Sequence, residues 1–312
     1  MNRLRLPIRL GLRRRFRRHW RTLCRQSYEL KEQLRGRLLE QLGVDAVPVF
    51  WWRDVVNFGD LITPMLLPHF GLRAFFAPPT RATLFSTGSI LQFVPPDYRG
   101  YIVGSGLIMD VNVRPIPQAR ILGLRGRLTQ RLLGVSTDVV LGDPGLLAVQ
   151  LSGVTARPRH PLGIVPHHSE MAHPALHEFV ARYPNEVIII DPRQQPRVVF
   201  AAIAECAAVL SSSLHGLVTA DALGIPNRRL TLSGALKGGS FKFHDYYSAY
   251  AGKVEQRDQA APAPITLNPT LTLQNAIAAT LPPSAQIPEV QANLARLFHD
   301  FAARYRDDAG RH

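Results

Sequence analysis

The chain has 312 residues, of which 46% are hydrophobic, and its formal net charge is +14. This length fits two domains of ordinary size, and this apolar content is enough to build packed cores. Its two cysteines, Cys24 and Cys206, lie far apart, which argues against a disulfide framework or a zinc site. Because no apolar run approaches the roughly 18 to 20 residues of a membrane span, and no signal-peptide core follows the basic start, we expect a cytoplasmic protein.

Most of the positive charge lies in residues 1–37. They hold twelve arginines and one lysine against two glutamates, and thus eleven of the fourteen net positive charges. On a helical wheel the arginines fall mostly opposite an apolar face, which consists of Leu12, Phe16, Trp20, Leu23, Leu30 and Leu34. We therefore predict that residues 1–45 form a basic amphipathic segment that binds the anionic inner face of the cell membrane. An organelle transit peptide and a basic arm for nucleic acid are alternatives, although the near-neutral charge of the remaining chain disfavours nucleic acid.

Strands and helices are expected to alternate through residues 46–150. A hinge is predicted at Gly43–Pro48, and the folded body is expected to begin at Val49. The expected strands are Val49–Trp52, Arg81–Ser86, Tyr101–Val103, Ala119–Leu124 and Val139–Leu141. They lead to turns rich in small or polar residues, namely Asn57–Asp60, Thr87–Ser89, Gly104–Gly106, Arg125–Gly126 and Gly142–Gly145. With a helix ending at Gly71 and another at Leu128–Leu133, this order favours a mostly parallel sheet covered by helices.

The same alternation recurs in residues 151–258. The expected strands are Leu162–Val165, Val187–Ile190, Ala207–Leu210 and Arg229–Leu232. Polar residues again follow strand ends, at His167-His168 and at Asp191–Arg193. Residues 259–312 contain a predicted Pro-rich linker, Ala260–Pro269, and an amphipathic helix, Val290–Phe301. The sequence therefore predicts an α/β fold with two Rossmann-like parallel-sheet domains that face each other across a cleft.

The stretch Ser211–Pro226, SSSLHGLVTADALGIP, joins a strand end to a helix. Ligands of open α/β sheets bind at the carboxyl ends of strands, and the free N–H groups of a helix start attract phosphate or carboxylate. His215 is expected at this rim, where it could exchange protons near neutral pH. The alternative is an ordinary capped helix, because serines are common caps. Asp143 is likewise expected to be a structural cap, and Trp51 and Trp52 either stack on sugar or belong to the core.

Six motifs, taken in order and with their spacing, resemble those of the polysaccharide pyruvyl transferases. They are NFGD at Asn57–Asp60, GSG at Gly104–Gly106, RGRLT at Arg125–Thr129, GDPG at Gly142–Gly145, the SSSLHG stretch, and FKFHDYY at Phe241–Tyr247. The resemblance runs from about Phe50 to Tyr250 and is greatest to the bacterial exopolysaccharide ketal-pyruvate transferases of the xanthan and succinoglycan type. It implies a fold like the GT-B glycosyltransferases, phosphoenolpyruvate as the donor, and a sugar of an exopolysaccharide or lipid-linked repeat unit as the acceptor. The implied products are a pyruvate ketal and phosphate.

Two positions depart from the family's pattern. Members often have Arg where this chain has Ser213, so contacts to the donor's anionic groups are expected from Arg125, Arg193 or Lys237. The usual Pro of the RGPLT motif is Arg127 here. Neither change removes the histidine or the glycine of the LHG motif.

Ketal formation, which the resemblance implies, gives roles to these residues. Phosphoenolpyruvate brings about three negative charges, which call for guanidinium groups and oriented N–H groups. His215 is the expected general acid, and His167, His168 or Asp60 the expected base, with a solvated loop pair as the alternative for the two adjacent histidines. The residues expected to bind substrates are Asn57, Gly59, Gly104, Ser105, Gly106, Arg125, His167, Arg193, Ser212, Ser213, Leu214, Gly216 and Lys237. No metal-ligand spacing stands out, so no metal and no cofactor are expected.

Two other functions fit the same pattern. The fold admits a glycosyltransferase with a nucleotide-sugar donor. Such an enzyme needs a carboxylate in the second half to hold ribose, and near the LHG helix the sequence offers only Asp221. The other candidate is a non-catalytic scaffold of polysaccharide assembly, bound to the membrane through its basic arm.

Overall fold

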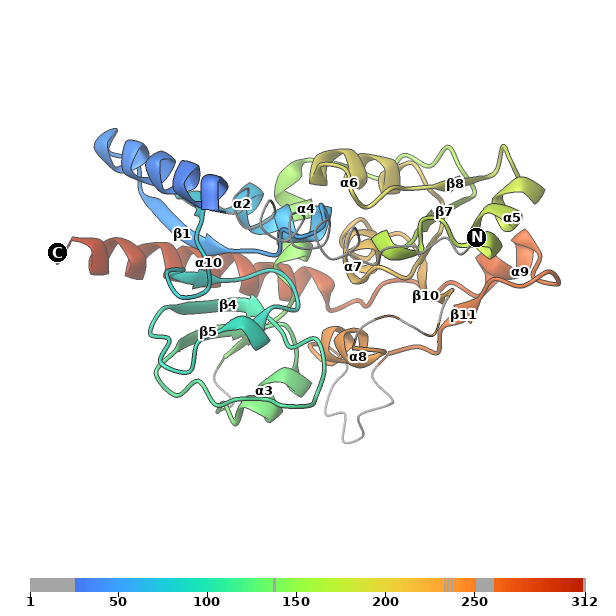
Figure 1. The fold of residues 1–312 in the computed structure, drawn as a ribbon. Coiled ribbons are helices and arrows are strands. Elements are labelled where there is room, and N and C mark those ends of the chain that lie inside the picture. The colour runs from blue at the N-terminus through green and yellow to red at the C-terminus, as the bar shows by residue number, and fades with distance from the viewer. Residues whose placement is uncertain are drawn as a thin grey trace, which may run out of the picture.

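Two parallel β-sheets form the body of the protein (Figure 1). The computed structural model describes residues 26–136, 139–232, 234, 236, 238–250 and 261–310. Within these residues the named strands form one six-stranded and one five-stranded sheet, and every pairing between them is parallel. The predicted α/β class with two Rossmann-like parallel sheets is confirmed.

The first sheet is built from the amino-terminal half of the chain. Its strands are β1 (Ala46–Phe50), β2 (Arg73–Phe76), β3 (Leu84–Phe85), β4 (Tyr101–Ser105), β5 (Arg120–Leu124) and β6 (Val140–Leu141), in the spatial order β2-β1-β3-β4-β5-β6. Its helices are η1 (Phe58–Leu61), α2 (Ile62–Leu66), η2 (Leu67–Phe70), η3 (Leu91–Phe93), α3 (Arg127–Leu133) and α4 (Pro144–Ser152). Trp51 is buried edge-on against Phe76, and Trp52 stacks on Phe93, which favours the core role for both tryptophans.

Two predictions about this half are wrong. β1 begins at Ala46, so the expected hinge Gly43–Pro48 overlaps a strand. The Pro48 carbonyl points to the β3 side, where it accepts a hydrogen bond from Thr83 N (2.8 Å). The pairing with β3 begins only at Leu84, so the N–H that proline lacks leaves no acceptor of β3 unpaired. In addition, β2 has no counterpart in the prediction, because its four-residue run follows the end of η2 almost directly.

The second sheet follows in the carboxyl-terminal half. Its strands are β7 (Leu162–Val165), β8 (Val187–Ile189), β9 (Val209–Ser211), β10 (Asn227–Thr231) and β11 (Ile265–Thr266), in the spatial order β11-β10-β9-β7-β8. Its helices are η4 (His168–Glu170), α5 (Pro174–Arg182), α6 (Pro196–Ala204), α7 (Leu214–Ala222) and α8 (Phe241–Tyr247). β11 corrects the expectation of a plain linker at Ala260–Pro269, because it pairs with β10.

The end of the chain returns to the first sheet. After α9 (Leu273–Ala278), the helix α10 (Ile287–Ala309) contains the predicted helix Val290–Phe301 and runs beside the first sheet, as the red helix in Figure 1 shows. Val290 packs on Gly142, where a Cβ would fall 2.7 Å from Val290 Cγ1. Because Gly142 begins the GDPG turn, α10 supports the turn that carries Asp143.

Residues 26–41 form a helix that packs on β2. Glu32 accepts a hydrogen bond from Phe76 N (3.0 Å), and Gly36 lies against the Phe75 ring, where a Cβ would fall 2.8 Å from a ring carbon. Three leucines of this helix, Leu30, Leu34 and Leu38, are more than half exposed, and so is Leu42, which follows it. The first two belong to the predicted apolar face, whose other four members lie outside the described residues. In the described ranges no helix is long and apolar enough to span a membrane.

Candidate active site

The carboxyl ends of the strands in the two sheets meet at η1. Phe58 N donates a hydrogen bond to Pro192 O (2.8 Å) in the loop after β8. The Phe58 ring lies edge-on to Phe200 and to His215, with ring centroids 6.2 Å apart in both cases. Segments that follow β1, β8 and β9 are therefore in direct contact. This is the edge of the sheets where ligands of α/β proteins bind.

His215 lies in the first turn of α7 and is 7% exposed. Its Nε2 atom is 3.8 Å from Asp143 Oδ2. Its Nδ1 atom lies beside Gly59, where any Cβ would overlap the imidazole, so the NFGD motif needs glycine at this position. Burial lowers the pKa of His215, the nearby Asp143 carboxylate raises it, and the Arg125 and Lys242 cations lower it.

Lys242, in α8, is the cation that links the predicted site residues. It is 8% exposed, and burial lowers its pKa to about 8, assisted by the charges of Arg125 and Arg229 and opposed by Asp60 and Glu170. Its ammonium makes no hydrogen bond to a residue that the structure describes, and it lies 5.2 Å from the centre of the Phe243 ring.

The positive charge of Lys242 acts on the titratable residues of several neighbouring turns. Its charge shifts the pKa of groups after β1, β7 and β9, namely Asp60, His167, His168 and His215. The structure thus brings the predicted acid and the predicted bases around one buried cation. Sequence reasoning missed Lys242, although the FKFHDYY motif that contains it was singled out. Lys237, the predicted lysine, lies outside the described residues.

Asp60 has the properties of a base near neutral pH. Burial raises the pKa of Asp60 to about 7, and a hydrogen bond with Asn57 and the charge of Lys242 oppose this shift. Asn57 also caps η1 by accepting a hydrogen bond from Gly59 N (3.4 Å). The predicted pair Asn57 and Asp60 is therefore connected, and Asp60 titrates in the range where a general base is most effective.

The two adjacent histidines differ in their contacts. His167 N donates to Ser212 Oγ (2.8 Å), and His167 Nδ1 lies 2.7 Å from Ser169 Oγ. Burial lowers the pKa of His167 to about 3, and burial with the charges of Lys242 and Arg193 lowers that of His168. Both rings are thus held neutral, with centroids 4.0 Å apart. This favours His168 over His167 as the second base.

Glu170 is a buried carboxylate of the second half that sequence reasoning missed. It is 4% exposed and accepts a hydrogen bond from Ser212 Oγ (2.5 Å). The signal that could have found it is its place in the polar turn after β7, three residues beyond His167. Through Ser212, Glu170 connects the turn after β7 to the turn after β9.

Arg125, the first choice for contact with the donor, is instead bound by the protein. It is fully buried. Its Nε and Nη2 atoms lie 2.9 and 2.8 Å from Asp245 Oδ2, Nη2 also donates to Leu107 O (2.6 Å), and Nη1 donates to Ser89 Oγ (2.5 Å). Asp245 accepts two further hydrogen bonds from Thr129, one from its N and one from its Oγ1. Arg125 therefore fastens α3 to α8 and leaves no nitrogen without a protein partner.

The predicted glycines and serines of this edge are mainly packing residues. A Cβ on Gly106 would fall 2.5 Å from the Arg125 guanidinium, and one on Gly104 would fall 2.5 Å from Pro144. Ser105 Oγ donates to Gly88 O (2.9 Å). These contacts explain the GSG motif without a ligand, so a ligand contact there stays a prediction.

The start of α7 is also tightly packed. Leu214 is 4% exposed, and any Cβ on Gly216 would overlap Ser211 Oγ. Ser213 is the N-cap of α7 but makes no side-chain capping bond, and its backbone N–H donates to Ser211 Oγ (3.0 Å). Arg193 is exposed and forms an ion pair with Asp191 (2.7 Å). It approaches the site only through its charge on His168.

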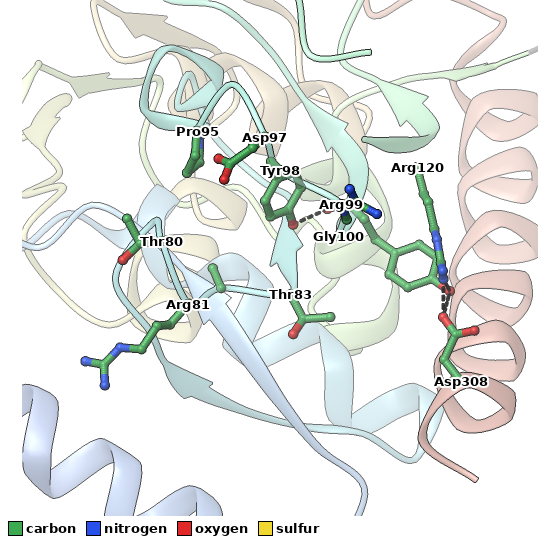
Figure 2. Close-up of a pocket in the computed structure, with 12 residues that line it drawn as sticks. Thr80, Arg81, Thr83, Pro95, Asp97, Tyr98, Arg99, Gly100, Arg120 and Asp308 are labelled. Atoms are coloured by element: carbon green, nitrogen blue, oxygen red, sulfur yellow. Dashed lines mark hydrogen bonds and ion pairs between the residues drawn. The ribbon is translucent and has the colours of Figure 1, made fainter. Parts of the chain in front are cut away.

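A hollow of about 570 Å³ lies at the other edge of the first sheet (Figure 2). Its polar lining includes Thr80, Arg81, Thr83, Arg99, Arg120 and Asp308, which lie near the amino ends of β3, β4 and β5 and the end of α10. None of the predicted site residues lines it. The candidate active site is therefore the cluster around Lys242 and His215, and not this hollow.

In the described part of the chain, no group of three or more His, Cys, Asp and Glu side chains is arranged to hold a metal ion. Metal independence stays a prediction.

Known proteins share the part of the chain that carries most of these residues. Residues 116–233 match the family model of the polysaccharide pyruvyl transferases, and this segment includes Asp143, His168 and His215. This part of the chain is similar to the polysaccharide pyruvyl transferases. It is 26% identical over 207 residues to the succinoglycan biosynthesis protein ExoV of Rhizobium meliloti (strain 1021), which covers 64% of this chain and 63% of that protein.

A second relative comes from a virus. An uncharacterized protein of Acanthamoeba polyphaga mimivirus is 29% identical over 167 residues, 51% of this chain and 56% of that protein. The chain thus spans less than two thirds of the length of either relative.

Proposed function

We propose that the protein is an enzyme that moves pyruvate from phosphoenolpyruvate to a sugar of an exopolysaccharide or lipid-linked repeat unit. The product is a ketal, and phosphate is released. The family match and the similarity to a succinoglycan biosynthesis protein support the class of reaction. The observation that carries the proposal is the gathering of a proton donor, a base and a buried cation, His215, Asp60 and Lys242, where the two sheets meet.

The donor would bind to Lys242 and to the start of α7. A buried ammonium with no hydrogen-bond partner among the described residues is unfavourable until an anion arrives, because desolvation penalises an unpaired charge. The backbone N–H groups at the start of α7 have no side-chain cap, and helix starts favour anions. Phosphoenolpyruvate supplies both a phosphate and a carboxylate for these two places. Arg193 and Lys237 remain proposed outer contacts, whereas Arg125 acts by holding α8, and thus Lys242, in position.

The proposed reaction needs two proton transfers at its first stage. His215 gives a proton to the enol carbon of the donor, which leaves an oxocarbenium-like carbon. A sugar hydroxyl adds to this carbon as Asp60 accepts its proton. Phosphate then departs with the electron pair of its bond to the same carbon. A second hydroxyl takes its place, loses its proton to His168, and closes the ketal ring.

Release of phosphate from phosphoenolpyruvate tests this function. The assay uses the full chain with a membrane fraction that carries lipid-linked oligosaccharide, because the acceptor is proposed to be of that kind. We expect acceptor-dependent release in the wild type, loss of release in His215→Ala, and no change in His177→Ala, which alters an exposed histidine of α5. We also expect release to continue with chelator present; activity that disappears in chelator and returns with a divalent ion contradicts metal independence.

The glycosyltransferase alternative is less favoured by the contacts of Asp221. Its carboxylate accepts hydrogen bonds from Asn227 Nδ2 (2.7 Å) and Tyr246 Oη (2.7 Å), so it is not available to hold a ribose. Glu170 is the other carboxylate of this region, and Ser212 occupies one of its oxygens. Absence of phosphate release together with binding of a nucleotide sugar would favour the glycosyltransferase. Absence of both, with binding to polysaccharide assembly proteins, would favour a scaffold.

We further propose that residues 1–37 place the enzyme on the anionic inner face of the cell membrane, where a lipid-linked acceptor is found. Leu30 and Leu34, two residues of the predicted apolar face, are more than half exposed, and Leu38 and Leu42 continue the same i, i+4 spacing. Exposed leucines beside arginines are typical of helices that lie on membranes.

A further inference from the structure

His215 and Asp143 face each other inside the protein. The Nε2 atom of His215 lies 3.8 Å from the Oδ2 atom of Asp143. Both atoms are buried, and neither has a hydrogen-bond partner among the residues that the structure describes. Buried polar atoms nearly always have a partner. Two unsatisfied atoms of opposite character that face each other therefore call for a functional explanation.

The other oxygen of Asp143 holds this carboxylate in place. Asp143 Oδ1 accepts a hydrogen bond from Gly145 N (2.9 Å) and caps α4. The predicted structural cap is thus confirmed, but it uses only one carboxylate oxygen. α4 lies beside α7, since a Cβ on Gly145 would fall 2.9 Å from Val218 Cγ1. The cap consequently fixes Oδ2 against the first turn of α7, which carries His215.

The Nδ1 atom of His215 has a different environment. It lies beside Gly59, which has no side chain to cover it. It is not among the fully buried atoms that lack a partner. The two ring nitrogens are therefore distinct: Nε2 faces a carboxylate of the protein, whereas Nδ1 faces the backbone of Gly59, which leaves Nδ1 as the nitrogen that can exchange a proton with a substrate.

Four groups from different elements act on the His215 ring. The Phe58 ring of η1 packs edge-on against it. Burial and the charges of Arg125 and Lys242 lower its pKa, and Asp143 raises it. Of these charged groups, Asp143 alone favours the protonated ring that a general acid needs.

We propose that Asp143 is a positioning residue that binds the Nε2 proton of His215 and so presents Nδ1 as the atom that exchanges a proton with the substrate. Its part in catalysis rests on the proposed function, whereas the choice of tautomer does not. When the charged ring gives its Nδ1 proton to the donor, it becomes the neutral ring with its remaining proton on Nε2, facing Asp143. A separation of 3.8 Å exceeds a formed hydrogen bond, but catalytic hydrogen bonds are often long without substrate and tighten in the complex.

Nitrogen-15 NMR of the histidine rings in the full-length protein tests the proposal. His215 is assigned from its absence in His215→Gln, and its ring nitrogens are then followed with pH. We expect the neutral ring to carry its proton on Nε2 in the wild type. In Asp143→Asn we expect the pKa of His215 to fall by about one unit and the preference for one tautomer to be lost. Asparagine keeps the cap on α4, because its oxygen also accepts a hydrogen bond from Gly145 N.

Asp191→Asn is the matched control. It removes a carboxylate of equal charge after β8, one that is paired with Arg193. Asp191 is not among the charged groups that shift the pKa of His215. The pKa of His215 should not change. If Asp143→Asn does not fold, Asp143→Ser replaces it, since a serine hydroxyl also caps a helix.

Two results overturn the proposal: a wild-type neutral ring with its proton on Nδ1, or the same pKa of His215 with and without the Asp143 carboxylate. Kinetics separate this failure from failure of the proposed function. If the protein transfers pyruvate, Asp143→Asn should lower kcat at least 10-fold, shift the pH profile to lower pH, and leave KM for phosphoenolpyruvate close to that of the wild type. A lowered kcat with an unshifted pH profile overturns the catalytic role. If the protein transfers no pyruvate, the NMR titration still decides the pairing.

Discussion

The guanidinium of Arg125 and the carboxylate of Asp245 form a fully buried ion pair 2.8 Å apart. The two residues are 120 positions apart in the chain, and they connect the motif RGRLT to the motif FKFHDYY. Gly126 makes this approach possible, because any Cβ there would overlap the Asp245 backbone. Two of the motifs that resemble those of the family are thus connected by one buried ion pair.

This pair predicts a large loss of stability when it is broken. Removing one partner leaves an uncompensated buried charge, which typically costs about 3 to 5 kcal/mol. We therefore expect Asp245→Asn to lower the free energy of unfolding by about this amount, as measured by denaturant titration. The control is Asp300→Asn, which breaks an exposed pair with Arg304 in α10 and should cost less than about 1 kcal/mol. Equal, small losses in both variants would contradict the structural role of Arg125.

The sequence predicted the fold better than it predicted which cations are paired within the protein. Strand ends are local patterns, and the polar turns after β1, β7 and β9 carry Asp60, His168 and His215 as expected. Whether an arginine is free or paired depends on distant residues. Arg125 is bound by a carboxylate that only folding brings near, and Lys242 is likewise buried only in the folded protein.

Lys242 predicts how donor binding depends on pH. Its pKa is lowered to about 8, so the side chain carries a positive charge below that pH and loses this charge above it. The affinity for phosphoenolpyruvate, measured by calorimetry, should therefore fall as pH rises through 8. Lys242→Met should weaken binding at least about 10-fold at pH 7, since a charge-assisted contact is worth 1.5 kcal/mol or more.

Lys242→Arg and Lys31→Met complete this experiment. Arginine keeps its charge above pH 8, so Lys242→Arg should bind the donor with little change between pH 7 and 9. Lys31 is exposed on the helix of residues 26–41, and its replacement should leave the affinity unchanged. Undiminished binding by Lys242→Met would remove this lysine from the donor site.

Asp60 predicts a trade between stability and activity. Its pKa is raised to about 7, so it favours the folded state at low pH, and this contribution is lost as pH rises through 7. Asparagine does not titrate, so its contribution to stability does not change with pH. Because Asp60 is partly accessible to water, we expect Asp60→Asn to gain about 2 kcal/mol more stability at pH 8.5 than at pH 5, relative to wild type.

The same variant should lose phosphate release, because asparagine cannot accept the hydroxyl proton. The control is Asp97→Asn, at an exposed carboxylate, which should change neither the stability difference nor the activity. A stability gain without loss of activity would show that Asp60 is buried but is not the base.

The exposed leucines predict membrane binding that can be removed without unfolding the protein. Leu34 and Leu38 are 57% and 56% exposed, whereas Glu32 and Gly36 on the other face fasten the helix to β2. Replacing both leucines with Asp therefore removes apolar area and adds negative charge on the outer face alone. We expect the full chain to float with vesicles that contain anionic phosphatidylglycerol, and the double variant to float several-fold less. Val198→Asp, at a half-exposed residue of α6, is the control and should float like the wild type. Equal flotation of all three proteins would show that these leucines take no part in membrane binding.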